Sequence, residues 1–350
     1  MLIGIHKDLY NEFGPFIEKY ESILKINGIE SIRLEINEPE FWDKVKDLDI
    51  FIFRWQHNDD HHQIAETILP VIENQLQIKC FPDLNTCWHF DDKIRQYYLL
   101  KNMSFPIIES HVFFDKNAAY KWASNAHFPV VFKLKGGAGS MNVVLVKTKK
   151  QAIKVINRMF GRGVIINKIP FKGNTSKKDF NLYKYIHRLG GNFLRKINDR
   201  DVTQVWQKHK NYVLFQDFMP NNDFDTRITI IGNRAFGFRR LNRKNDFRSS
   251  GSGYLEYDVN EIDIEFIKIA FEISKKMKFQ SMAYDFLYDH DKNPVLCEIS
   301  YTFKDSAVFN CPGYWDDQMQ WHKGNYWPQY CQLVDLLGLE NLKQPIKKGH

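Results

Sequence analysis

Two carboxylates and a hydroxyl lie close together in the segment "MAYDFLYDHDKNPVLCEIS", residues 282–300. Apolar runs on both sides of the turn "DHDKNP" predict adjacent strands that direct Asp285 and Glu298 into one cleft. Ser300 follows Glu298 by two residues, so the two share one face of their strand. Oxygen ligands of this kind suit Mg²⁺, which takes its remaining ligands from phosphates and water. The segment therefore predicts a metal site, with a solvated acidic hairpin as the alternative.

The segment "FKLKGGAGSMNVVLV", residues 132–146, places glycines between two apolar strands. Lys133 ends the first strand among apolar neighbours. Gly136, Gly137 and Gly139 let the backbone approach an anion, which successive N–H groups can bind as a concave nest. The spacing matches neither the P-loop nor the dinucleotide-binding fingerprint. A phosphate-binding loop and a surface hairpin with solvated lysines are both open at this point.

A third segment, "LFQDFMPNNDFDTRITIIG" (214–232), contains an apolar strand that breaks at Pro220. Such a strand can offer free backbone N–H and C=O groups to the edge of an adenine. An acidic residue a few positions further on can bind ribose hydroxyls, and the second strand of the segment carries Arg227. We interpret this segment as a nucleotide-contacting strand edge.

The elements that must position these groups begin with a small parallel α/β lobe over residues 1–85, where four apolar strands alternate with helical segments. Ligands of such a sheet bind beyond the carboxyl ends of its strands. The segment "RWQHNDDHH" (54–62) follows the third strand and is therefore placed in that crevice. Arg54 and Trp55 are candidates for a substrate pocket there, with core packing as the alternative.

Three histidines gather in the same segment, namely His57, His61 and His62. One interpretation is a metal site. We prefer a polar helix start, because Asp59 and Asp60 suit the positive end of a helix dipole.

Residues 86–165 read as an α+β unit in which a helix with an acidic start covers 91–105. From 171 to 210 Lys and Arg far outnumber Asp. This stretch predicts a basic insertion or surface helices, with a nucleic-acid patch as the less favoured interpretation. Antiparallel strands and a helix follow up to about residue 300.

Composition restricts the class of protein. A chain of 350 residues exceeds the usual size of one core, so two or three lobes are expected. No apolar run spans a bilayer and the first residues lack signal-peptide features, so a cytoplasmic protein without membrane insertion is expected. The 5 cysteines form no CxxC pair, which favours reduced thiols. The net charge of +7 favours anionic partners such as nucleotides, sugar phosphates or nucleic acid.

The order of these segments resembles the ATP-grasp superfamily. That order is a helix led by Asp-Lys, the lysine and glycine hairpin, "QDFM", "DTR", "FRSS", and then Asp with Glu-x-Ser. The chain is most similar, over roughly residues 80–300, to the branch with the ribosomal-protein glutamate ligase and, more distantly, D-alanine–D-alanine ligase. The resemblance implies an ATP-grasp fold that combines α/β and α+β lobes. Its expected parts are an α/β pre-ATP-grasp domain (1–85), a small lid subdomain (86–165), a basic insertion (166–210), a large subdomain with the metal site (211–305) and an aromatic tail (306–350).

The same resemblance implies a role for individual residues. The expected contacts to ATP are Lys93, Lys133, Gly136, Gly137, Gly139, Ser140, Gln216, Asp217, Phe218 and Asp223. Asp225 competes with Asp223 for the ribose, and Met219 completes the hinge whose backbone would read adenine. The expected catalytic residues, facing the γ-phosphate and an acyl phosphate, are Arg227 and Arg248. The expected ligands of Mg²⁺ are Asp285, Glu298 and Ser300.

Two departures from the family pattern concern the metal and the acceptor. Ser300 stands where relatives carry Asn, and a hydroxyl is a poorer Mg²⁺ ligand than a carboxamide oxygen. This leaves the number of metal ions open. The stretch "YTFKD" replaces the family's small-Pro-Gly segment, so a specialised acceptor end is expected.

The implied chemistry is ATP-dependent ligation. ATP phosphorylates a substrate carboxylate, and an amine then attacks the acyl phosphate to form an amide, with release of ADP and phosphate. One alternative is a phosphotransferase that stops at the phosphorylated product, in some cases with release of AMP. Another is a non-catalytic nucleotide-binding module.

The substrates are expected to be small molecules, a carboxylate and an amine, with no nucleic-acid partner. The basic insertion and the tail residues Trp315, Trp321 and Trp327 suggest a nucleotide-linked sugar or its acid, as in bacterial surface-polysaccharide metabolism. The preferred alternative is that these tryptophans fill the core of the tail. The oligomeric state, a homodimer included, is left open.

Overall fold

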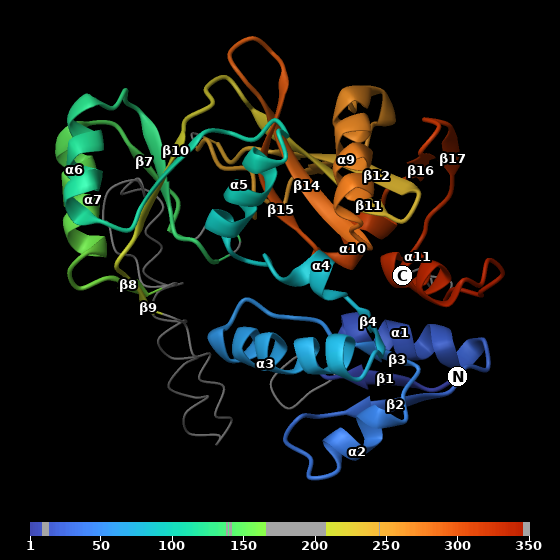
Figure 1. Ribbon diagram of the computed structural model, residues 1–350. Helices are drawn as coiled ribbons and strands as arrows, with labels where there is room; N and C mark the ends of the chain where they lie inside the picture. Colours follow the sequence, from blue (N-terminus) through green and yellow to red (C-terminus); the bar gives the residue numbers. More distant parts are fainter. Residues whose placement is uncertain (9–13, 138, 140–141, 166–207, 245, 346–350) are drawn as a thin grey trace, which may run out of the picture. The chain divides into compact units, whose positions relative to one another are not determined.

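The computed structural model describes residues 1–8, 14–137, 139, 142–165, 208–244 and 246–345. Contacts between residues divide the chain into two units (Figure 1). Unit 1 comprises residues 1–57, 61–108 and 219–350, and unit 2 comprises 58–60 and 109–218. Ser140 and nearly all of the basic insertion lie outside the described residues. The five-part division proposed above stays a prediction.

The N-terminal part of unit 1 is a parallel sheet in the order β2-β1-β3-β4. Its strands are β1 (Ile3–His6), β2 (Ser31–Leu34), β3 (Ile50–Ile52) and β4 (Lys79–Phe81). The connecting helices are α1 (Pro15–Ile26), α2 (Phe41–Lys46) and α3 (Asp59–Pro70), the last continued by the π-helix η1 (Val71–Gln75). The parallel α/β lobe expected near the start of the chain is therefore present.

Strand β3 shows how both faces of this sheet are covered. Ile50 and Ile52 pack with α1 and with the C-terminal helix α11 (Pro328–Leu337), whereas Phe51 and Phe53 pack with α2 and α3. A strand that is buried on both faces reads as a continuous apolar run. This explains why its sequence, "DIFIF", predicts a buried strand.

The remainder of unit 1 is built on an antiparallel sheet in the order β15-β14-β11-β12-β16-β17, with β13 paired to β12. The strands are β11 (Phe224–Ile231), β12 (Arg234–Leu241), β13 (Leu255–Glu256), β14 (Ser281–Tyr288), β15 (Pro294–Ser300), β16 (Gly313–Asp316) and β17 (Trp321–Lys323). The helical elements are α4 (Leu84–Cys87), α5 (Lys93–Asn102), η2 (Val259–Glu261), α9 (Ile264–Met277) and α10 (Asp305–Phe309). Helix α9 packs its apolar side against β11 and β14.

The aromatic tail contributes to the core of unit 1. Trp315 and Trp327 are each only 8% exposed. Trp321 is partly exposed and packs edge-on against Trp315, with ring centroids 4.5 Å apart. Two of the three tail tryptophans therefore fill core space and do not form an open stacking surface.

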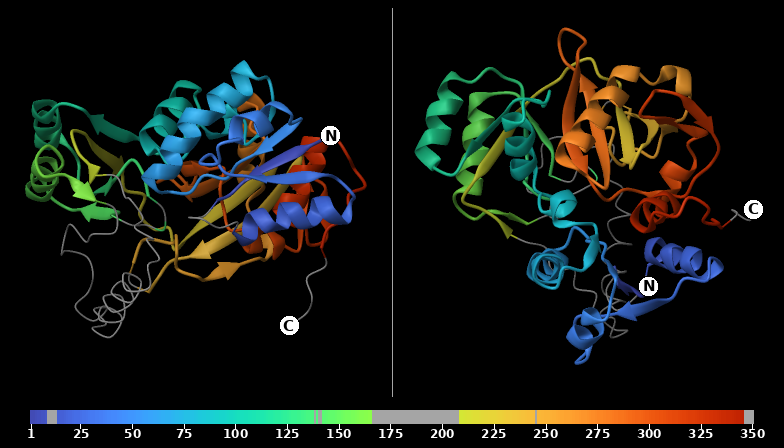
Figure 2. Two further views of the ribbon diagram at one scale, coloured as in Figure 1. Left: turned by 90° about the horizontal axis from the view of Figure 1, so that it is seen from below. Right: turned by 45° about the vertical axis from the view of Figure 1, so that its right-hand side comes forward.

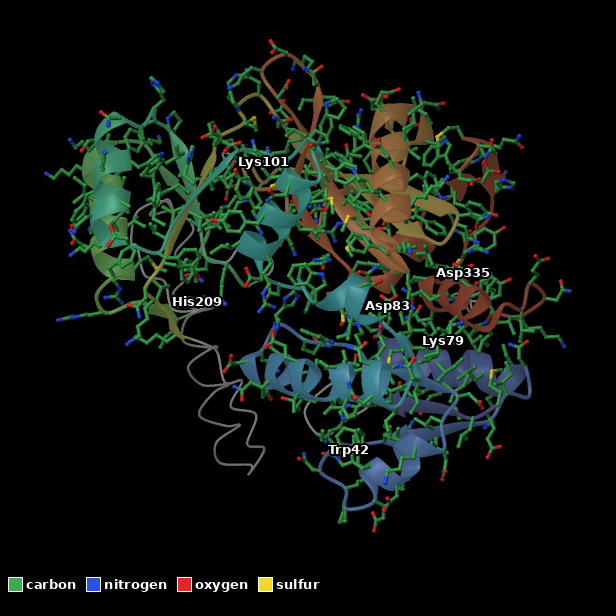
Figure 3. All side chains as sticks on the ribbon, viewed as in Figure 1. Trp42, Lys79, Asp83, Lys101, His209 and Asp335 are labelled. Atoms are coloured by element: carbon green, nitrogen blue, oxygen red, sulfur yellow. The ribbon has the colours of Figure 1, made fainter. Side chains whose placement is uncertain are left out.

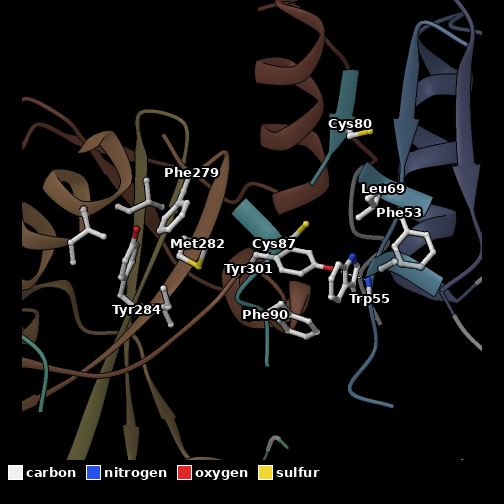
Figure 4. Packing of buried hydrophobic residues seen from close by; sticks show 14 of the residues in the cluster. Phe53, Trp55, Leu69, Cys80, Cys87, Phe90, Phe279, Met282, Tyr284 and Tyr301 are labelled. Carbon is white, nitrogen blue, oxygen red and sulfur yellow. Dashed lines mark hydrogen bonds between the residues drawn. The ribbon is translucent and has the colours of Figure 1, made fainter. Parts of the chain in front are cut away.

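One cluster of buried side chains joins the α/β lobe to the antiparallel sheet (Figure 4). The backbone N–H of Trp55, three residues after β3, donates a hydrogen bond of 2.7 Å to the Tyr301 hydroxyl. Tyr301 follows directly after β15, and its ring packs edge-on against Phe90 with centroids 4.9 Å apart. The carboxyl ends of β3 and β15 therefore lie side by side.

Unit 2 is an antiparallel sheet in the order β5-β10-β6-β7. Its strands are β5 (Ser110–Phe113), β6 (Val130–Lys133), β7 (Val144–Val146) and β10 (Val213–Asp217), and the short strands β8 (Val164–Ile165) and β9 (Lys208–His209) pair separately. Helices α6 (Lys116–Asn125) and α7 (Lys149–Met159) lie side by side and pack on its strands (Figure 2). The lysine and glycine loop joins β6 to β7, as the sequence predicts.

Two further expectations concern cysteines and the membrane. The five cysteines are free, in agreement with the prediction of reduced thiols, and four of them are buried. In the part of the chain that the structure describes, the helices are too short or too polar to cross a membrane.

His6, at the end of β1, is a buried neutral imidazole. Its Nδ1 lies 2.8 Å from the Lys7 carbonyl oxygen and donates to it, and its Nε2 accepts from the Ile36 N–H at 3.1 Å. Burial lowers the pKa of His6 from 6.5 to about 4. The unfolded state therefore takes up a proton at this residue first as the pH falls.

We predict that the free energy of unfolding decreases between pH 6.5 and pH 4, and that His6 accounts for about 3 kcal/mol of the decrease. Urea unfolding of wild type and His6→Gln across this range measures the effect. The variant should be less stable at pH 7 but should show a flatter pH dependence. His290→Gln, in an exposed turn, should keep the wild-type slope. Parallel profiles for wild type and His6→Gln would contradict the assignment.

Candidate active site

One face of the antiparallel sheet in unit 1 carries charged side chains that lie opposite one another in register. Asp225 on β11 is opposite Arg240 on β12, and Arg227 on β11 is opposite Asp285 on β14. Asp285 is in turn opposite Glu298 on β15. Because alternate residues of a strand share a face, all five side chains lie on one side of the sheet. The intervening residues pack against α9 on the other side.

Asp285 is held by two arginines. Arg227 donates to it from Nε to Oδ1 at 2.7 Å and from Nη2 to Oδ2 at 2.8 Å. Arg240 donates to Asp285 Oδ2 at 2.7 Å and binds both Asp225 oxygens at 2.6 Å. Burial alone would raise the pKa of Asp285, but the two guanidinium groups lower it well below its usual range. Asp285 is therefore a fixed, ionised carboxylate.

A β-bulge decides which face of the sheet Glu298 occupies. Phe286 pairs with Leu296 and Asp285 pairs with Glu298, so Cys297 is the extra residue between them. In an unbroken ladder Cys297 would lie opposite Asp285, and Glu298 would face the core. Bulges that redirect a side chain in this way are common beside functional sites. The sequence analysis predicted the shared face of Asp285 and Glu298 but not the bulge that creates it.

Lys93 pairs with Glu298, at 3.1 Å between Nζ and Oε1. It is the first residue of α5, whose preceding residue Asp92 caps the helix by accepting from the N–H groups of Ile94 and Arg95. Burial would lower the pKa of Lys93, but the charges of Glu298 and Asp91 outweigh it and raise the pKa. The expected nucleotide-binding lysine and an expected metal ligand are thus brought together.

The third expected metal ligand, Ser300, lies on the same strand face as Glu298. Its hydroxyl donates to the Thr302 carbonyl oxygen at 2.8 Å and lies 3.4 Å from the Thr302 hydroxyl, so the Ser300 oxygen keeps at least one lone pair for a further partner. Within the described ranges, no three or more His, Cys, Asp or Glu side chains gather in a way that could hold a metal ion.

The ribose and phosphate candidates differ in how they are already paired. Arg248 binds its neighbour Asp246, with Nη2 and Oδ2 at 2.6 Å. Asp225 is occupied by Arg240, whereas Asp223 is exposed and its carboxylate has no partner among the described residues. Of the two acids that compete for the ribose, Asp223 is therefore the one with an available carboxylate.

In unit 2, Lys133 and Gln216 are brought together from β6 and β10. The buried Lys133 ammonium donates to Gln216 Oε1 at 2.5 Å. Gly137 and Gly139 have φ values of 102° and 66°, a backbone conformation that glycine adopts without strain. Ser140 lies outside the described residues. The lysine and the glycine loop thus belong to one continuous hairpin.

The base of this hairpin is anchored by two aromatic side chains. The Tyr212 hydroxyl accepts from the Lys135 backbone N–H at 2.9 Å and lies 2.8 Å from His209 Nδ1. His209, labelled in Figure 3, is the last residue of β9. Lys135 therefore helps to anchor the hairpin through its backbone N–H group.

The prediction that Gln216 and Asp217 lie on a free strand edge is wrong. Both belong to β10, which pairs with β5 on one side and β6 on the other. The Asp217 backbone N–H also donates to the Glu109 carbonyl oxygen at 2.9 Å. The ladder ends at Asp217, so any adenine contact through backbone groups falls to Phe218 and Met219.

The sequence analysis missed Arg240. A signal was present, because the turn after β11 fixes the hairpin register. Ile231 pairs with Arg234, and counting back along both strands places Asp225 opposite Arg240. Two opposite charges at facing positions of a hairpin predict an ion pair.

Comparisons with known proteins agree with this architecture. Residues 190–305 match the family model of the RimK-like ATP-grasp domain. The uncharacterized MG012 homolog of Mycoplasma pneumoniae is 21% identical over 240 residues, which are 67% of this chain and 78% of that protein.

Two solved structures extend the likeness to nearly the whole chain. A RimK domain ATP-grasp protein of Sphaerobacter thermophilus has a TM-score of 0.54 and 12% identity, covering 96% of this chain and 99% of its own. The biotin carboxylase domain of the Hydrogenobacter thermophilus 2-oxoglutarate carboxylase has a TM-score of 0.55 and 10% identity. That match covers 98% of this chain and 70% of the carboxylase chain. The chain therefore has the ATP-grasp fold, and the predicted resemblance is confirmed. Within it, residues 190–305 form the part that is similar to the RimK-like ATP-grasp domain.

We predict that Arg240→Met lowers the free energy of unfolding by about 3–5 kcal/mol, because Asp225 and Asp285 lose a shared buried counter-charge. Arg33→Met removes an exposed pair with Glu21 and should cost at most about 1 kcal/mol. Urea unfolding at pH 7 compares the two. Equal losses would show that the buried network does not carry this energy.

Proposed function

We propose that this protein is an ATP- and Mg²⁺-dependent ligase that activates a carboxylate as an acyl phosphate and couples it to an amine. The observation that carries the proposal is the linked set of charges on one sheet face. Glu298 and Asp285 are in register, Lys93 pairs with Glu298, and Arg227 pairs with Asp285. The ATP-grasp fold supports the same reaction class.

The residues on this face fit a magnesium ion that is shared with phosphates. Mg²⁺ commonly uses one or two carboxylates and takes its other ligands from phosphate oxygens and water. Asp285 and Glu298 supply two carboxylates, and Ser300 adds a hydroxyl oxygen with at least one free lone pair. When bound there, the ion would neutralise charge on the transferring phosphoryl group.

The chain's own groups act around that charge. Arg227 and Arg240 hold the Asp285 carboxylate in one orientation and keep it ionised. Lys93 holds Glu298 in the same way. We assign Arg227 and Arg248 to the phosphoryl oxygens, because guanidinium groups bind phosphate through paired N–H donors.

The residues proposed to contact the nucleotide are those that the family resemblance implies, and each unit is considered by itself. Within unit 2, Lys133 and the loop of Gly136, Gly137, Gly139 and Ser140 are proposed to bind phosphates, and Gln216, Asp217 and Phe218 are proposed to bind adenine. Within unit 1, Lys93 and Asp223 are proposed as nucleotide contacts. Backbone amides of a glycine loop favour anions because their N–H dipoles converge.

The proposal defines the chemical class of the acceptor substrate less closely than it defines the nucleotide. Burial of Trp315 and Trp327 removes two of the rings that suggested stacking on a sugar. The proposal includes both an amino acid and a sugar acid as substrates. A function in polysaccharide metabolism is proposed from the sequence alone.

The proposal is tested by incubating the full chain with ATP and Mg²⁺, the twenty protein amino acids, and glucuronate, galacturonate and gluconate. Nucleotide products and new masses are then followed. ADP with a product that has lost one water is the expected result. AMP with a stable phosphorylated product would instead identify a phosphotransferase.

We predict that Lys133→Met and Glu298→Gln each abolish turnover, because the first variant loses a buried cation and the second loses the counter-charge of the Lys93 ammonium. Matched controls are Lys147→Met on the same hairpin and Glu272→Gln on α9, both exposed. The controls should retain wild-type rates. Turnover in either test variant would show that the site is misplaced.

A further inference from the structure

A buried carboxylate between two histidines adjoins the Lys93–Glu298 pair. Asp91 Oδ2 lies 3.3 Å from His57 Nδ1 and 3.7 Å from His62 Nε2. The Asp91 side chain is only 4% exposed, whereas that of His57 is 29% exposed. A buried carboxylate thus faces a ring nitrogen of a histidine that reaches solvent.

Aromatic contacts hold both imidazoles in place. The His62 ring stacks on Phe90 with centroids 5.6 Å apart and an interplanar angle of 10°. The His57 ring tilts over Phe90 at 5.1 Å, and Trp55 packs edge-on against His62 at 5.4 Å. Fixed rings of this kind keep one nitrogen directed at the carboxylate.

Within unit 1, the cluster of Asp91, His57 and His62 is connected to the residues of the proposed reaction site. Asp91 precedes Lys93 by two residues, and the Lys93 charge acts on both Asp91 and Glu298. His57 lies two residues after Trp55. The backbone N–H of Trp55 donates a hydrogen bond to the hydroxyl of Tyr301, the residue that directly follows β15. The cluster also lies beyond the carboxyl end of a parallel strand, where ligands of α/β sheets bind.

The charges around Asp91 keep it ionised. Burial would raise the pKa of Asp91, but His57, His62 and Lys93 lower it well below its usual range. The other ring nitrogen of His57, Nε2, has no hydrogen-bond partner among the described residues. His57 therefore has Nδ1 facing a buried carboxylate at 3.3 Å, while Nε2 makes no hydrogen bond within the described residues.

We propose that His57, oriented by Asp91, accepts the proton that the amine substrate must lose before it attacks the acyl phosphate. This inference rests on the proposed ligase function. The ammonium transfers one proton to His57 Nε2, and the resulting amine lone pair forms the C–N bond. The C–O bond to phosphate breaks, phosphate leaves with the bonding electron pair, and the second nitrogen proton passes to it. Asp91 and His62 are positioning residues.

The test compares an acceptor that needs a base with one that does not. Hydroxylamine is largely unprotonated at neutral pH, whereas the amino acids carry ammonium groups. With ATP, Mg²⁺ and the carboxylate pool described above, hydroxamate and amide products are measured for wild type, His57→Gln and Asp91→Asn. His322→Gln is the matched control, since His322 pairs with Asp316 at 2.6 Å on β16 and β17.

In His57→Gln the ratio of amide to hydroxamate should fall by about 100-fold, the scale of general base catalysis. In Asp91→Asn, ¹⁵N NMR of the His57 imidazole should show a changed balance between the Nδ1–H and Nε2–H tautomers without any substrate present, because Asp91 Oδ2 faces Nδ1. The control should leave the ratio unchanged.

Three outcomes overturn the inference. Equal loss of both products in His57→Gln would indicate a structural role, and no loss of either would show that His57 is not the acceptor. An unchanged tautomer balance of His57 in Asp91→Asn would contradict the orienting function of Asp91. If wild type forms neither hydroxamate nor amide, the ligase proposal fails as well, and that failure is recognised in the wild-type reaction alone.

Discussion

The site depends on mutual neutralisation of buried charges. Asp225 and Asp285 are each less than 10% exposed, and a carboxylate in that environment is strongly disfavoured unless cations bind it. Arg240 binds both acids, and Arg227 binds Asp285 through two parallel hydrogen bonds. These contacts require β11, β12 and β14 to be neighbours in one register. Charge satisfaction and strand order therefore enforce each other.

The same sheet face receives Lys93 from the start of α5. The buried cluster that unites the two parts brings the start of α5 and the end of β3 to the carboxyl end of β15. Lys93 consequently meets Glu298, although more than half of the chain separates them in sequence.

Local patterns in the sequence predicted much of this arrangement. Alternating apolar residues and turn residues placed Asp285, Glu298 and Ser300 on neighbouring strands, and the glycine loop was correctly read as a hairpin after Lys133. The continuous apolar run of β3 identified a strand buried on both faces. Each of these inferences depends only on residues close in the chain, where backbone geometry limits the choices.

The sequence by itself determined the element types, the ordered motifs and the ATP-grasp resemblance, since these follow from local periodicity and spacing. Only the tertiary structure decided that Cys297 forms a bulge, that β10 is a central strand, and that Arg240 bridges Asp225 and Asp285. It also decided that Asp91 lies between two histidines. The physical reason is that strand neighbours and buried ion pairs depend on packing between distant segments, which no local pattern specifies.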